Sequence, residues 1–591
     1  MILVPAPKSL EFLGKSAIVP KKGYIFIDDR KLLAGAKKLK EELFGYTISM
    51  YDSKDSFVRV YVDESQIGKS EGYKLVVRDG SIVIIGNDIR GAFYGMMTLK
   101  QILRNYPDEI PNMRIIDYPD FPNRGFMLDI SRDRVPKIET LKSIIDLLSE
   151  LKYNQFQLYI EHTFAYRNHE KVWRDYSPLT SEEIIELDEY AKERMVELVP
   201  NQNSFGHLEK WLIHDEYKKY AEVEDGFMTP WGFRMNHPFS LSPAAEGVFD
   251  FLRSLYKEFL PNFSSDKFNI GCDETFDLCQ GRSKKLCEKK GKGRVYLDFL
   301  LKVHEIVKEF KKTTMFWGDI IKNHPELVPE IPDSVIALIW GYEKDHPFDE
   351  ECRIFKSSGI PFYVVPGTSS WNSIIGRVGN MIGNVDNAIS NGLKYGSIGV
   401  LMTDWGDNGH WQHLPISFPG IVYASAKSWN HSSDIDLSKA LSMHVLMDET
   451  FGSGKALVDI GNAYRVTGVD IFNANIFGAA LIWPERFKER GEVDLEKLEK
   501  AREILIDARE RFLSSPLRRN DSEILKKEIE NGVDMATFSI DFIEKLKGEE
   551  IDLKERFSKL LEEYKTTWLL RNREGGLKQS VEKLRKIEKY L

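Results

Sequence analysis

The stretch KFNIGCDET, Lys267–Thr275, places two neighbouring carboxylates directly after an apolar alternation that is typical of a short buried strand. Gly271 gives the backbone freedom ahead of Asp273 and Glu274. Two carboxylates this close repel each other, and in a partly dry pocket the pKa of one rises until that acid keeps its proton near neutral pH. The pair then offers one proton donor and one anion, which cleavage of a glycosidic bond requires. The alternative is a solvated Asp-Glu pair in a loop, so the surrounding chain has to decide.

Eight strand patterns alternate with helical patterns across the middle of the chain. The strands are predicted at 124–130, 155–160, 196–202, 267–274, 314–319, 335–342, 361–367 and 398–407. One intervening helix begins at a capping-box pattern, Thr180 with Glu183. Parallel strands joined by right-handed helical crossovers close into a barrel at eight repeats. The sequence therefore predicts an α/β fold with a (β/α)8 TIM barrel over residues 120–431.

The segments on either side of the predicted barrel have different patterns. Residues 1–119 mix strand patterns with an amphipathic helix, GAFYGMMTLKQIL at Gly91–Leu103, which predicts a small N-terminal α/β accessory domain whose helix docks against a neighbour. A proline-marked linker, DYPDFPN, follows it. Residues 432–591 carry helical stripes rich in Lys and Glu, which predicts an α-helical C-terminal domain.

Composition argues against several classes of function. The net charge of -9, from 82 basic and 91 acidic side chains, disfavours a nucleic-acid binder and suits a neutral or weakly polar substrate. No apolar run is long enough to span a membrane. The N-terminal MILVPAPKSLEFLGKS has prolines and a lysine where a signal peptide needs an unbroken apolar segment, so we expect a cytoplasmic protein that binds neither nucleic acid nor membrane.

The cysteine pattern suggests no metal cofactor, and the C-terminal arginines leave the oligomeric state open. The four cysteines are Cys272, Cys279, Cys287 and Cys352. Because they are irregularly spaced and form no CxxC pair, we expect reduced thiols rather than a disulfide framework or a zinc site. In TTWLLRNREGGLKQS the glycine pair marks a helix end, and the alternative is that Arg571 or Arg573 reaches the pocket or the second subunit of a homodimer.

Acids, histidines and tryptophans recur where the predicted barrel strands end. These residues are Glu161, His162, Asn203, His207, Asp273, Glu274, Trp317, Asp319, Trp340, Trp371, Trp405 and Asp407. In a TIM barrel the active site lies at the carboxyl ends of the strands. Aromatic faces pack on the C–H side of a pyranose and carboxylates accept its hydroxyls, so this shared position predicts a sugar pocket. Taken alone, each tryptophan would more often belong to the core, and only their shared position favours the pocket.

The barrel resembles glycoside hydrolase family 20, the β-N-acetylhexosaminidases, and in particular bacterial members with a helical C-terminal domain. Six short motifs occur in order: RGFMLDISR at Arg124–Arg132, FGH at Phe205–His207, GCDET at Gly271–Thr275, FWGD at Phe316–Asp319, LIWGY around Trp340 and TDWGD at Thr403–Asp407. The helix at Gly91–Leu103 also resembles that of the family's accessory domain. The resemblance covers roughly residues 1–430, and the order of the motifs makes it specific.

The resemblance implies a retaining exo-hydrolase of terminal β-linked N-acetylglucosamine or N-acetylgalactosamine. The oxygen of the substrate's own 2-acetamido group is the nucleophile in this family. Glu274 corresponds to the general acid and base, and Asp273 to the carboxylate that orients the acetamido N–H and balances developing positive charge. The implied partner is a small glycoside or an oligosaccharide, and no cofactor is required.

The resemblance also implies a set of substrate-binding residues. Arg124 corresponds to the arginine that binds the 3- and 4-hydroxyls of the sugar, and Asp407 to the acid that holds the 4- and 6-hydroxyls. The alternative for Arg124 is a buried pair with Asp129 or another barrel acid. The other implied pocket residues are Glu161, His207, Trp317, Asp319, Trp340, Trp371 and Trp405.

The chain departs from the family pattern at several positions. Asn269 stands where much of the family has histidine, and Cys272 replaces a glycine of the acidic motif. The family tyrosine that binds the acetamido oxygen is not evident in PGTSSWNS, 366–373, where Trp371 or Asn372 is nearby. The acidic pair after the second strand is replaced by Glu161, His162 and Thr163.

Three rival functions remain. The first is a two-carboxylate retaining glycosidase in which Asp319 or Asp407 is the nucleophile. The second is a carbohydrate-binding barrel without catalysis. The third is a metal-dependent hydrolase, which is disfavoured because His162, His207 and His410 lack the paired spacing of metal sites.

Overall fold

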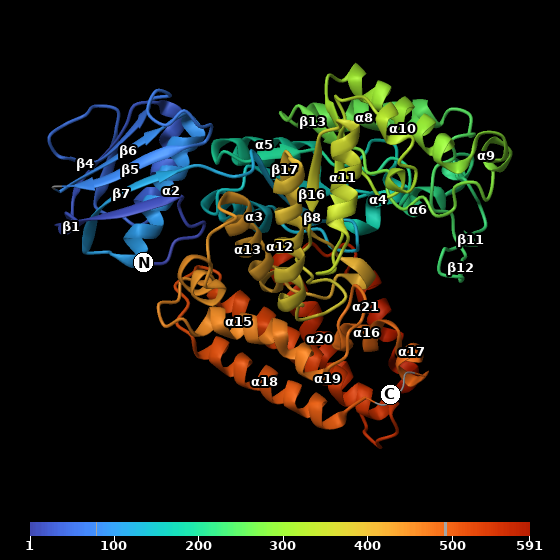
Figure 1. Cartoon of the computed structure of the whole chain (residues 1–591). Helices are drawn as coiled ribbons and strands as arrows, with labels where there is room; N and C mark the ends of the chain where they lie inside the picture. The colour runs from blue at the N-terminus through green and yellow to red at the C-terminus, as the bar shows by residue number, and fades with distance from the viewer. Residues whose placement is uncertain (79, 490–492) are drawn as a thin grey trace.

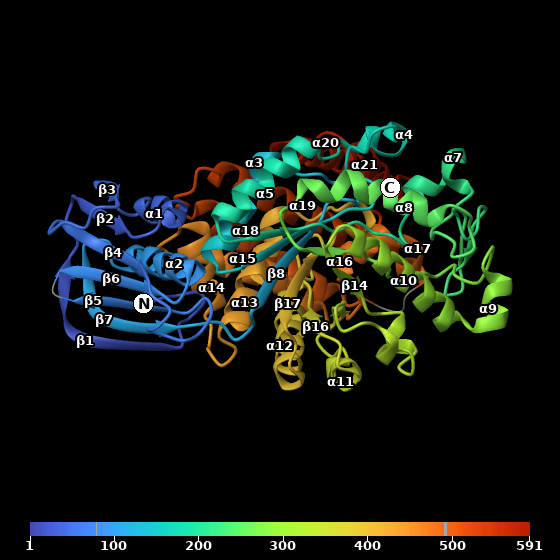
Figure 2. The same ribbon diagram turned by 90° about the horizontal axis from the view of Figure 1, so that it is seen from above.

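The computed structural model describes residues 1–78, 80–489 and 493–591. A sheet formed by the N-terminal part of the chain (blue in Figure 1) lies beside a central barrel, and helices from the C-terminal part (orange to red) pack along another side of that barrel. Figure 2 shows the same arrangement from above, with the N-terminal sheet at one end of the molecule. The predicted fold class, a TIM barrel with an N-terminal α/β part and a helical C-terminal part, is confirmed.

Eight parallel strands form the barrel. They are β8 (Asn123–Asp129), β9 (Gln155–Tyr159), β10 (Glu197–Val199), β13 (Lys267–Asn269), β14 (Thr313–Trp317), β15 (Ile336–Trp340), β16 (Phe362–Val365) and β17 (Gly399–Asp404). Their order is β10-β9-β8-β17-β16-β15-β14-β13. The two end strands are joined beyond β10, where the Asn269 N–H donates to Pro200 O at 2.9 Å and the Gln202 N–H to Asn269 O at 3.0 Å. These two bonds close the barrel.

Helices cover the outside of the barrel. The longer ones are α3 (Ile138–Glu150), α5 (Ser181–Glu193), α8 (Val248–Phe259), α10 (Lys292–Glu309), α11 (Phe348–Ser358), α12 (Val378–Tyr395) and α13 (Phe418–Trp429). Short helices α4 (Glu170–Trp173), α6 (Glu209–Leu212) and α7 (Asp215–Lys218) lie in the connections. The predicted capping box at the start of α5 is present, because Thr180 and Glu183 exchange both hydrogen bonds.

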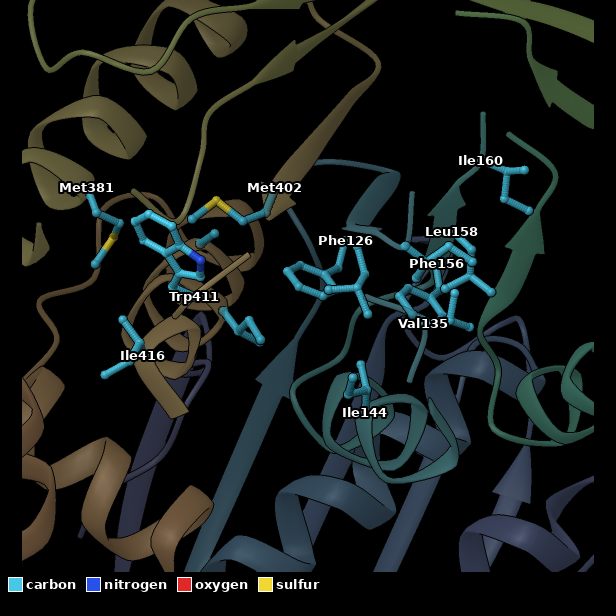
Figure 3. Packing of buried hydrophobic residues seen from close by; sticks show 14 of the residues in the cluster. Phe126, Val135, Ile144, Phe156, Leu158, Ile160, Met381, Met402, Trp411 and Ile416 are labelled. Atoms are coloured by element: carbon cyan, nitrogen blue, oxygen red, sulfur yellow. The ribbon is translucent and has the colours of Figure 1, made fainter. Parts of the chain in front are cut away.

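Two apolar layers hold the barrel together. On the outer face, Phe126 of β8 stacks on Phe156 of β9 with ring centroids 6.1 Å apart, in the same core as Ile144 of α3 (Figure 3). A separate cluster that includes Met127 and Leu338 fills the interior. Each fully buried side chain of this size contributes about 1.5–3 kcal/mol to the stability of the fold. Because strand residues alternate between these two layers, the side chains available for the mouth are those at and beyond the strand ends.

The N-terminal part is a seven-stranded sheet with the order β1-β7-β5-β6-β4-β2-β3. Its elements are β1 (Ser9–Ile18), β2 (Gly23–Ile27), α1 (Leu33–Lys40), β3 (Tyr46–Ser49), β4 (Ser56–Val62), β5 (Tyr73–Arg78), β6 (Ser81–Gly86), α2 (Ile89–Asn105) and β7 (Glu109–Asp117). Helix α2 docks on the barrel as predicted: Lys100 bonds to Glu150 of α3 at 2.6 Å, and Tyr94 meets Trp429 of α13 edge-on.

The C-terminal part is helical, as predicted. Its helices are α14 (Leu437–Ala440), α15 (Gly452–Asn462), α16 (Ile476–Ile482), α17 (Pro484–Glu489), α18 (Leu495–Ser514), α19 (Ser522–Leu546), α20 (Lys554–Arg571) and α21 (Leu577–Arg585). Arg571 pairs with Glu528 at 2.8 Å, and Arg573 pairs with Glu183 at 2.5 Å. Both arginines are thus used in structural pairs, and their proposed reach into the pocket is not observed.

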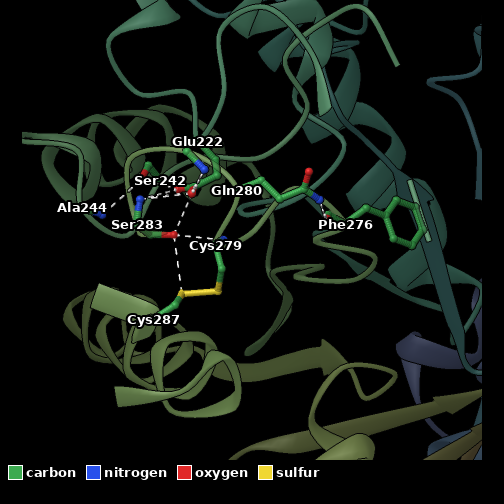
Figure 4. Close-up of a disulfide and its surroundings, with 9 residues drawn as sticks. Glu222, Ser242, Ala244, Phe276, Cys279, Gln280, Ser283 and Cys287 are labelled. Atoms are coloured by element: carbon green, nitrogen blue, oxygen red, sulfur yellow. Dashed lines mark hydrogen bonds between the residues drawn. A yellow bond between two sulfur atoms is a disulfide. The ribbon is translucent and has the colours of Figure 1, made fainter. Parts of the chain in front are cut away.

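The expectation that all four cysteines are reduced is wrong for one pair. Cys279 and Cys287 form a disulfide, whereas Cys272 and Cys352 are free and buried. The disulfide joins the loop after the acidic stretch to α9 (Lys284–Lys290) (Figure 4). In the same loop the Ser283 hydroxyl donates to Glu222 at 2.7 Å. The sequence spacing gave no indication of this pair, because the short turn between them forms only in the folded loop.

The described helices include none with the length and apolar character needed to cross a lipid bilayer.

Candidate active site at the barrel mouth

The backbone leaves β13 abruptly before the two acids. The predicted strand extends to Glu274, but β13 ends at Asn269, and Gly271, Cys272 and Glu274 have φ values of 70°, 71° and 49°. A Cβ on Gly271 would lie 2.4 Å from the side-chain oxygen of Asn203, so only glycine fits there. These left-handed residues separate the environments of the two acids: the Asp273 side chain is 8% exposed and that of Glu274 is 32% exposed.

His207 lies between the two acids. Its Nε2 is 3.4 Å from Asp273 Oδ2 and 3.2 Å from Glu274 Oε2. Burial opposes a charge on His207, but the carboxylate of Asp273 outweighs it and the pKa of His207 lies well above its ordinary value. Asp273 is also buried, yet His207 and a 3.0 Å hydrogen bond from Asn203 Nδ2 lower its pKa. We therefore expect an imidazolium beside an anionic Asp273 at neutral pH.

Arg132 and Glu161 form the next layer of this charge network. Arg132 is 3.2 Å from Asp129 and 3.3 Å from Glu161, and its guanidinium lies over the Trp405 ring with 5.0 Å to the centroid. Burial raises the pKa of Glu161 to about 7, although Arg132 and His207 oppose this shift. The Glu161 carboxyl is 3.8 Å from His207 Nδ1, which places it behind the histidine.

Arg124 is not part of this site, so its predicted role as a sugar ligand is wrong. It is 1% exposed, donates to Glu71 of the N-terminal part at 2.6 Å and lies 4.9 Å from the Trp429 ring centroid. The reason is position along β8: Arg124 is the second residue of the strand, and Asp129 at its other end is about 16 Å away at ~3.3 Å per residue. Arg132, which follows the carboxyl end of the same strand, lies in the site instead.

An aromatic cluster forms one wall of the mouth, and its centre is a residue that the sequence interpretation missed. Tyr342 stacks on Trp340 with centroids 5.2 Å apart, meets Trp371 edge-on at 5.0 Å, and its hydroxyl accepts a 2.8 Å hydrogen bond from Trp405 Nε1. Burial raises its pKa well above the usual value. Tyr342 lies in the quoted LIWGY motif, two residues after Trp340, so a search for tyrosine just beyond each strand end could have found it.

Trp317 and Trp371 lie in the barrel interior, behind the Tyr342 ring and the other aromatic side chains of the mouth. Each is 1% exposed, and both belong to the interior cluster of the barrel together with Trp405. The prediction that they line the pocket is corrected: Trp371 supports Tyr342, and Trp317 packs against Trp405 with centroids 5.9 Å apart. Within the described part of the chain, no acceptor pairs with the buried Nε1 of Trp317.

Two further acids complete the set. Asp319 accepts the backbone N–H of Glu274 at 3.1 Å and lies 3.4 Å from Trp340 Nε1. Burial, together with the charge of Asp273, raises the pKa of Asp319 to about 8. Burial likewise raises the pKa of Asp407 to about 6 against the opposing effect of Arg132. Asp319 is therefore largely protonated near neutral pH, whereas Asp407 is mostly ionised.

A cavity of about 410 Å³ opens on the exposed side of Glu274. Glu274, Phe276, Asp319 and Trp340 are among the residues that line it. Beside it, Trp231 packs edge-on against Phe276 at 4.9 Å and is 63% exposed, at the tip of a hairpin formed by β11 (Phe227–Met228) and β12 (Arg234–Met235).

The three histidines considered for a metal site, His162, His207 and His410, do not form one cluster. His410 bonds to Arg134, and His162 packs edge-on against Tyr176. Among the residues that the structure describes, the group able to hold a metal ion consists of His207, Asp273 and Glu274, whose ligand atoms lie within 4.8 Å of one another.

Comparison with known proteins agrees with this architecture. The model for the glycosyl hydrolase family 20 catalytic domain matches residues 121–372, and the model for domain 2 of the same family matches residues 1–118. The chain belongs to glycosyl hydrolase family 20. The two family-20 matches together span more than half of its length and leave the helical C-terminal part outside.

The curated relatives are distant. The beta-hexosaminidase of Porphyromonas gingivalis is 25% identical over 361 residues, which cover 54% of this chain and 46% of that protein. The human beta-hexosaminidase subunit beta is 24% identical over 342 residues, covering 53% and 56%. The chain therefore spans about half the length of these relatives.

Solved structures show the same fold. The chitobiase of Flavobacterium johnsoniae superimposes with a TM-score of 0.62 at 16% identity, over 98% of each chain. The beta-N-acetylhexosaminidase of Bacteroides fragilis gives 0.61 at 18% identity, over 76% of this family-20 chain and 96% of that one. At this level of identity the likeness concerns the fold.

Proposed function

We propose that this family-20 chain is a retaining exo-β-N-acetylhexosaminidase acting on terminal β-linked N-acetylglucosamine or N-acetylgalactosamine. The observation that carries the proposal is the unequal pair of acids. Asp273 is buried and held as an anion by His207, whereas Glu274 opens towards a cavity that Trp340 of the aromatic cluster also lines. The relatives named beta-hexosaminidase support the same activity.

In the proposed reaction the substrate supplies its own nucleophile. The acetamido carbonyl oxygen attacks C1 while the bond from C1 to the leaving oxygen breaks, and Glu274 gives its proton to that oxygen. Water then attacks C1 of the oxazolinium ion, the acetamido oxygen leaves C1, and the Glu274 carboxylate takes the proton of the water. Two successive inversions at C1 give overall retention.

The anionic Asp273 accepts the acetamido N–H and balances the positive charge that develops on the oxazolinium ring. Fixed charges that face developing charge in a water-poor site typically contribute several kcal/mol. His207 keeps Asp273 ionised and lies 3.2 Å from Glu274, so it couples the two acids. Glu161, behind His207, completes a relay in place of the acidic pair found in much of the family.

The sugar is held by Arg132, Asp407 and the aromatic cluster in this proposal. Arg132 and Asp407 bind the ring hydroxyls, and Trp405 supports the ring. Tyr342 donates to the acetamido oxygen, since its hydroxyl already accepts from Trp405 and retains a proton to give. The leaving group occupies the 410 Å³ cavity outside Glu274.

The raised pKa of Asp319 disfavours this acid as the nucleophile of a two-carboxylate mechanism. A carboxylate nucleophile must be ionised at the working pH, but burial raises the pKa of Asp319 to about 8. Asp407, with a pKa of about 6, is mostly ionised at neutral pH, and hydrolysis of the plain glucoside tests it as a nucleophile. Under the proposed mechanism neither acid bonds to the sugar carbon. Insensitivity of the activity to EDTA would exclude the metal-dependent rival.

The proposal is tested with aryl glycosides that differ only at C2 and C4. Hydrolysis of the N-acetylated substrates and strong inhibition by a thiazoline analogue of N-acetylglucosamine are expected, with little hydrolysis of the plain glucoside. Glu274→Gln should abolish turnover while the thiazoline still binds, which separates an enzyme from a binding barrel. Equal hydrolysis of glucoside and N-acetylglucosaminide would overturn the proposal.

A further inference from the structure

A turn from the C-terminal part contacts the aromatic cluster of the barrel mouth at Trp371. Ile471 and Ala474 pair across this turn, which precedes α16, and Asn473 lies at its tip with φ of 53°. Asparagine is one of the few residues other than glycine that adopts this backbone conformation readily. The barrel residues that the turn contacts follow strands β15 and β16, more than 100 positions earlier in the chain.

Asn473 makes three hydrogen bonds to the barrel. Its side-chain Oδ1 accepts from Trp371 Nε1 at 2.9 Å, its backbone N–H donates to Glu343 at 2.7 Å, and its carbonyl oxygen accepts from Asn372 at 3.2 Å. The Trp371 side chain is 1% exposed, so its N–H has no route to bulk water if Asn473 is shortened. A buried N–H without an acceptor is costly, and the indole ring would shift to find one.

These bonds hold Tyr342 from two sides. Trp371 packs edge-on against the Tyr342 ring, and Glu343, the next residue in the chain, is fixed by Asn473 and by Arg377 at 2.9 Å. The phenol ring is therefore oriented by contacts that end on the C-terminal turn. The same turn reaches the loop of Asp407 indirectly, because Asn372 Oδ1 accepts from Asn408 at 2.9 Å.

We propose that Asn473 is a positioning residue through which the C-terminal helical part orients Tyr342 towards the acetamido group. The inference rests on the proposed function, because it assigns Tyr342 to the acetamido oxygen. It gives the C-terminal part, which lies outside both family-20 matches, an effect on the reaction that passes through Trp371 and Tyr342. Asn473 itself touches neither the sugar nor the reacting atoms.

A double-mutant cycle in the full-length chain tests the inference. Asn473→Ala should lower kcat/KM for an aryl N-acetylglucosaminide, and the affinity for the thiazoline analogue, by about tenfold, the effect of one lost buried hydrogen bond. In a Trp371→Phe background, which has no indole N–H to satisfy, Asn473→Ala should change both quantities less than about threefold. Asp470→Asn, at an exposed position in the same loop, is the matched control and should leave both near wild type.

The outcomes separate a positioning role from a merely structural one. A structural residue would lower the thermal unfolding midpoint by the same amount in both backgrounds and leave thiazoline affinity unchanged. If Asn473→Ala does not fold, Asn473→Asp keeps an acceptor for the indole N–H and should retain kcat/KM within about threefold. Wild-type kinetics in Asn473→Ala, equal losses in both Trp371 backgrounds, or a large loss in a folded Asn473→Asp would each overturn the inference. Failure of the wild type to prefer N-acetylated substrates would instead refute the proposed function.

Discussion

Alanine substitution of two arginines, Arg132 and Arg124, provides a strong test of the site geometry. Arg132 contacts Asp129 and Glu161 at the mouth, whereas Arg124 pairs with Glu71 at the other end of the same strand. If Arg132 makes two charge-assisted hydrogen bonds to sugar hydroxyls, each contributing ~1.5 kcal/mol at least, its loss costs about 3 kcal/mol in kcat/KM. That free energy corresponds to roughly 150-fold.

The Arg124→Ala variant is expected to behave differently. Both members of the Arg124–Glu71 pair are nearly fully buried, and breaking such a pair typically costs about 3–5 kcal/mol of stability because an uncompensated charge remains. We therefore expect a lower unfolding midpoint with kcat/KM within about threefold of wild type in the protein that stays folded. The assay measures kcat/KM on an aryl N-acetylglucosaminide and thermal unfolding for both variants. A folded Arg124→Ala variant that loses as much activity as Arg132→Ala would refute the reasoning.

Three further predictions follow from individual contacts. Tyr342→Phe removes the proposed donor to the acetamido oxygen and also the acceptor of Trp405 Nε1, so it should lower kcat/KM roughly 10–100-fold and the unfolding free energy by about 1–3 kcal/mol; unchanged kinetics would contradict this. Burial raises the folded-state pKa of Asp319 to about 8, so the contribution of this acid to stability is complete below about pH 4 and is lost as the pH rises towards 8. Over this range the unfolding free energy of the wild type should therefore fall more steeply than that of Asp319→Asn. Parallel pH profiles of the two proteins in denaturant titrations would argue against this. Trp231→Ala should raise KM about fivefold for a disaccharide of N-acetylglucosamine and leave KM for an aryl monosaccharide unchanged, and equal effects on both would exclude a contact with the second sugar.

The fold and the acidic pair could be predicted from the sequence, because both depend on local patterns. The alternation of short strand patterns with helical patterns located the eight barrel strands, and the position of Asp273 and Glu274 just beyond one of them indicated their place at the mouth. The error at Arg124 arose because the motif RGFMLDISR contains an arginine at each end, and only the one at the carboxyl end, Arg132, can lie at the mouth.

Other features depend on tertiary packing. Trp317 and Trp371 face the barrel interior, and no local signal distinguishes an interior tryptophan from a wall of the pocket. The contact between Asn473 and Trp371 joins residues 102 positions apart, and the Cys279–Cys287 pair depends on a turn that forms only in the folded loop. Cys272 has φ of 71°, which explains in physical terms why much of the family has glycine there.

The central claim is that the acetamido oxygen of the substrate is the nucleophile. The most direct measurement is kcat/KM for aryl glycosides whose N-acetyl group carries zero, one, two or three fluorines, because fluorine withdraws electrons from the carbonyl oxygen without altering the rest of the sugar. The account predicts a steep, steady fall of kcat/KM along this series. A series in which kcat/KM stays constant would contradict it.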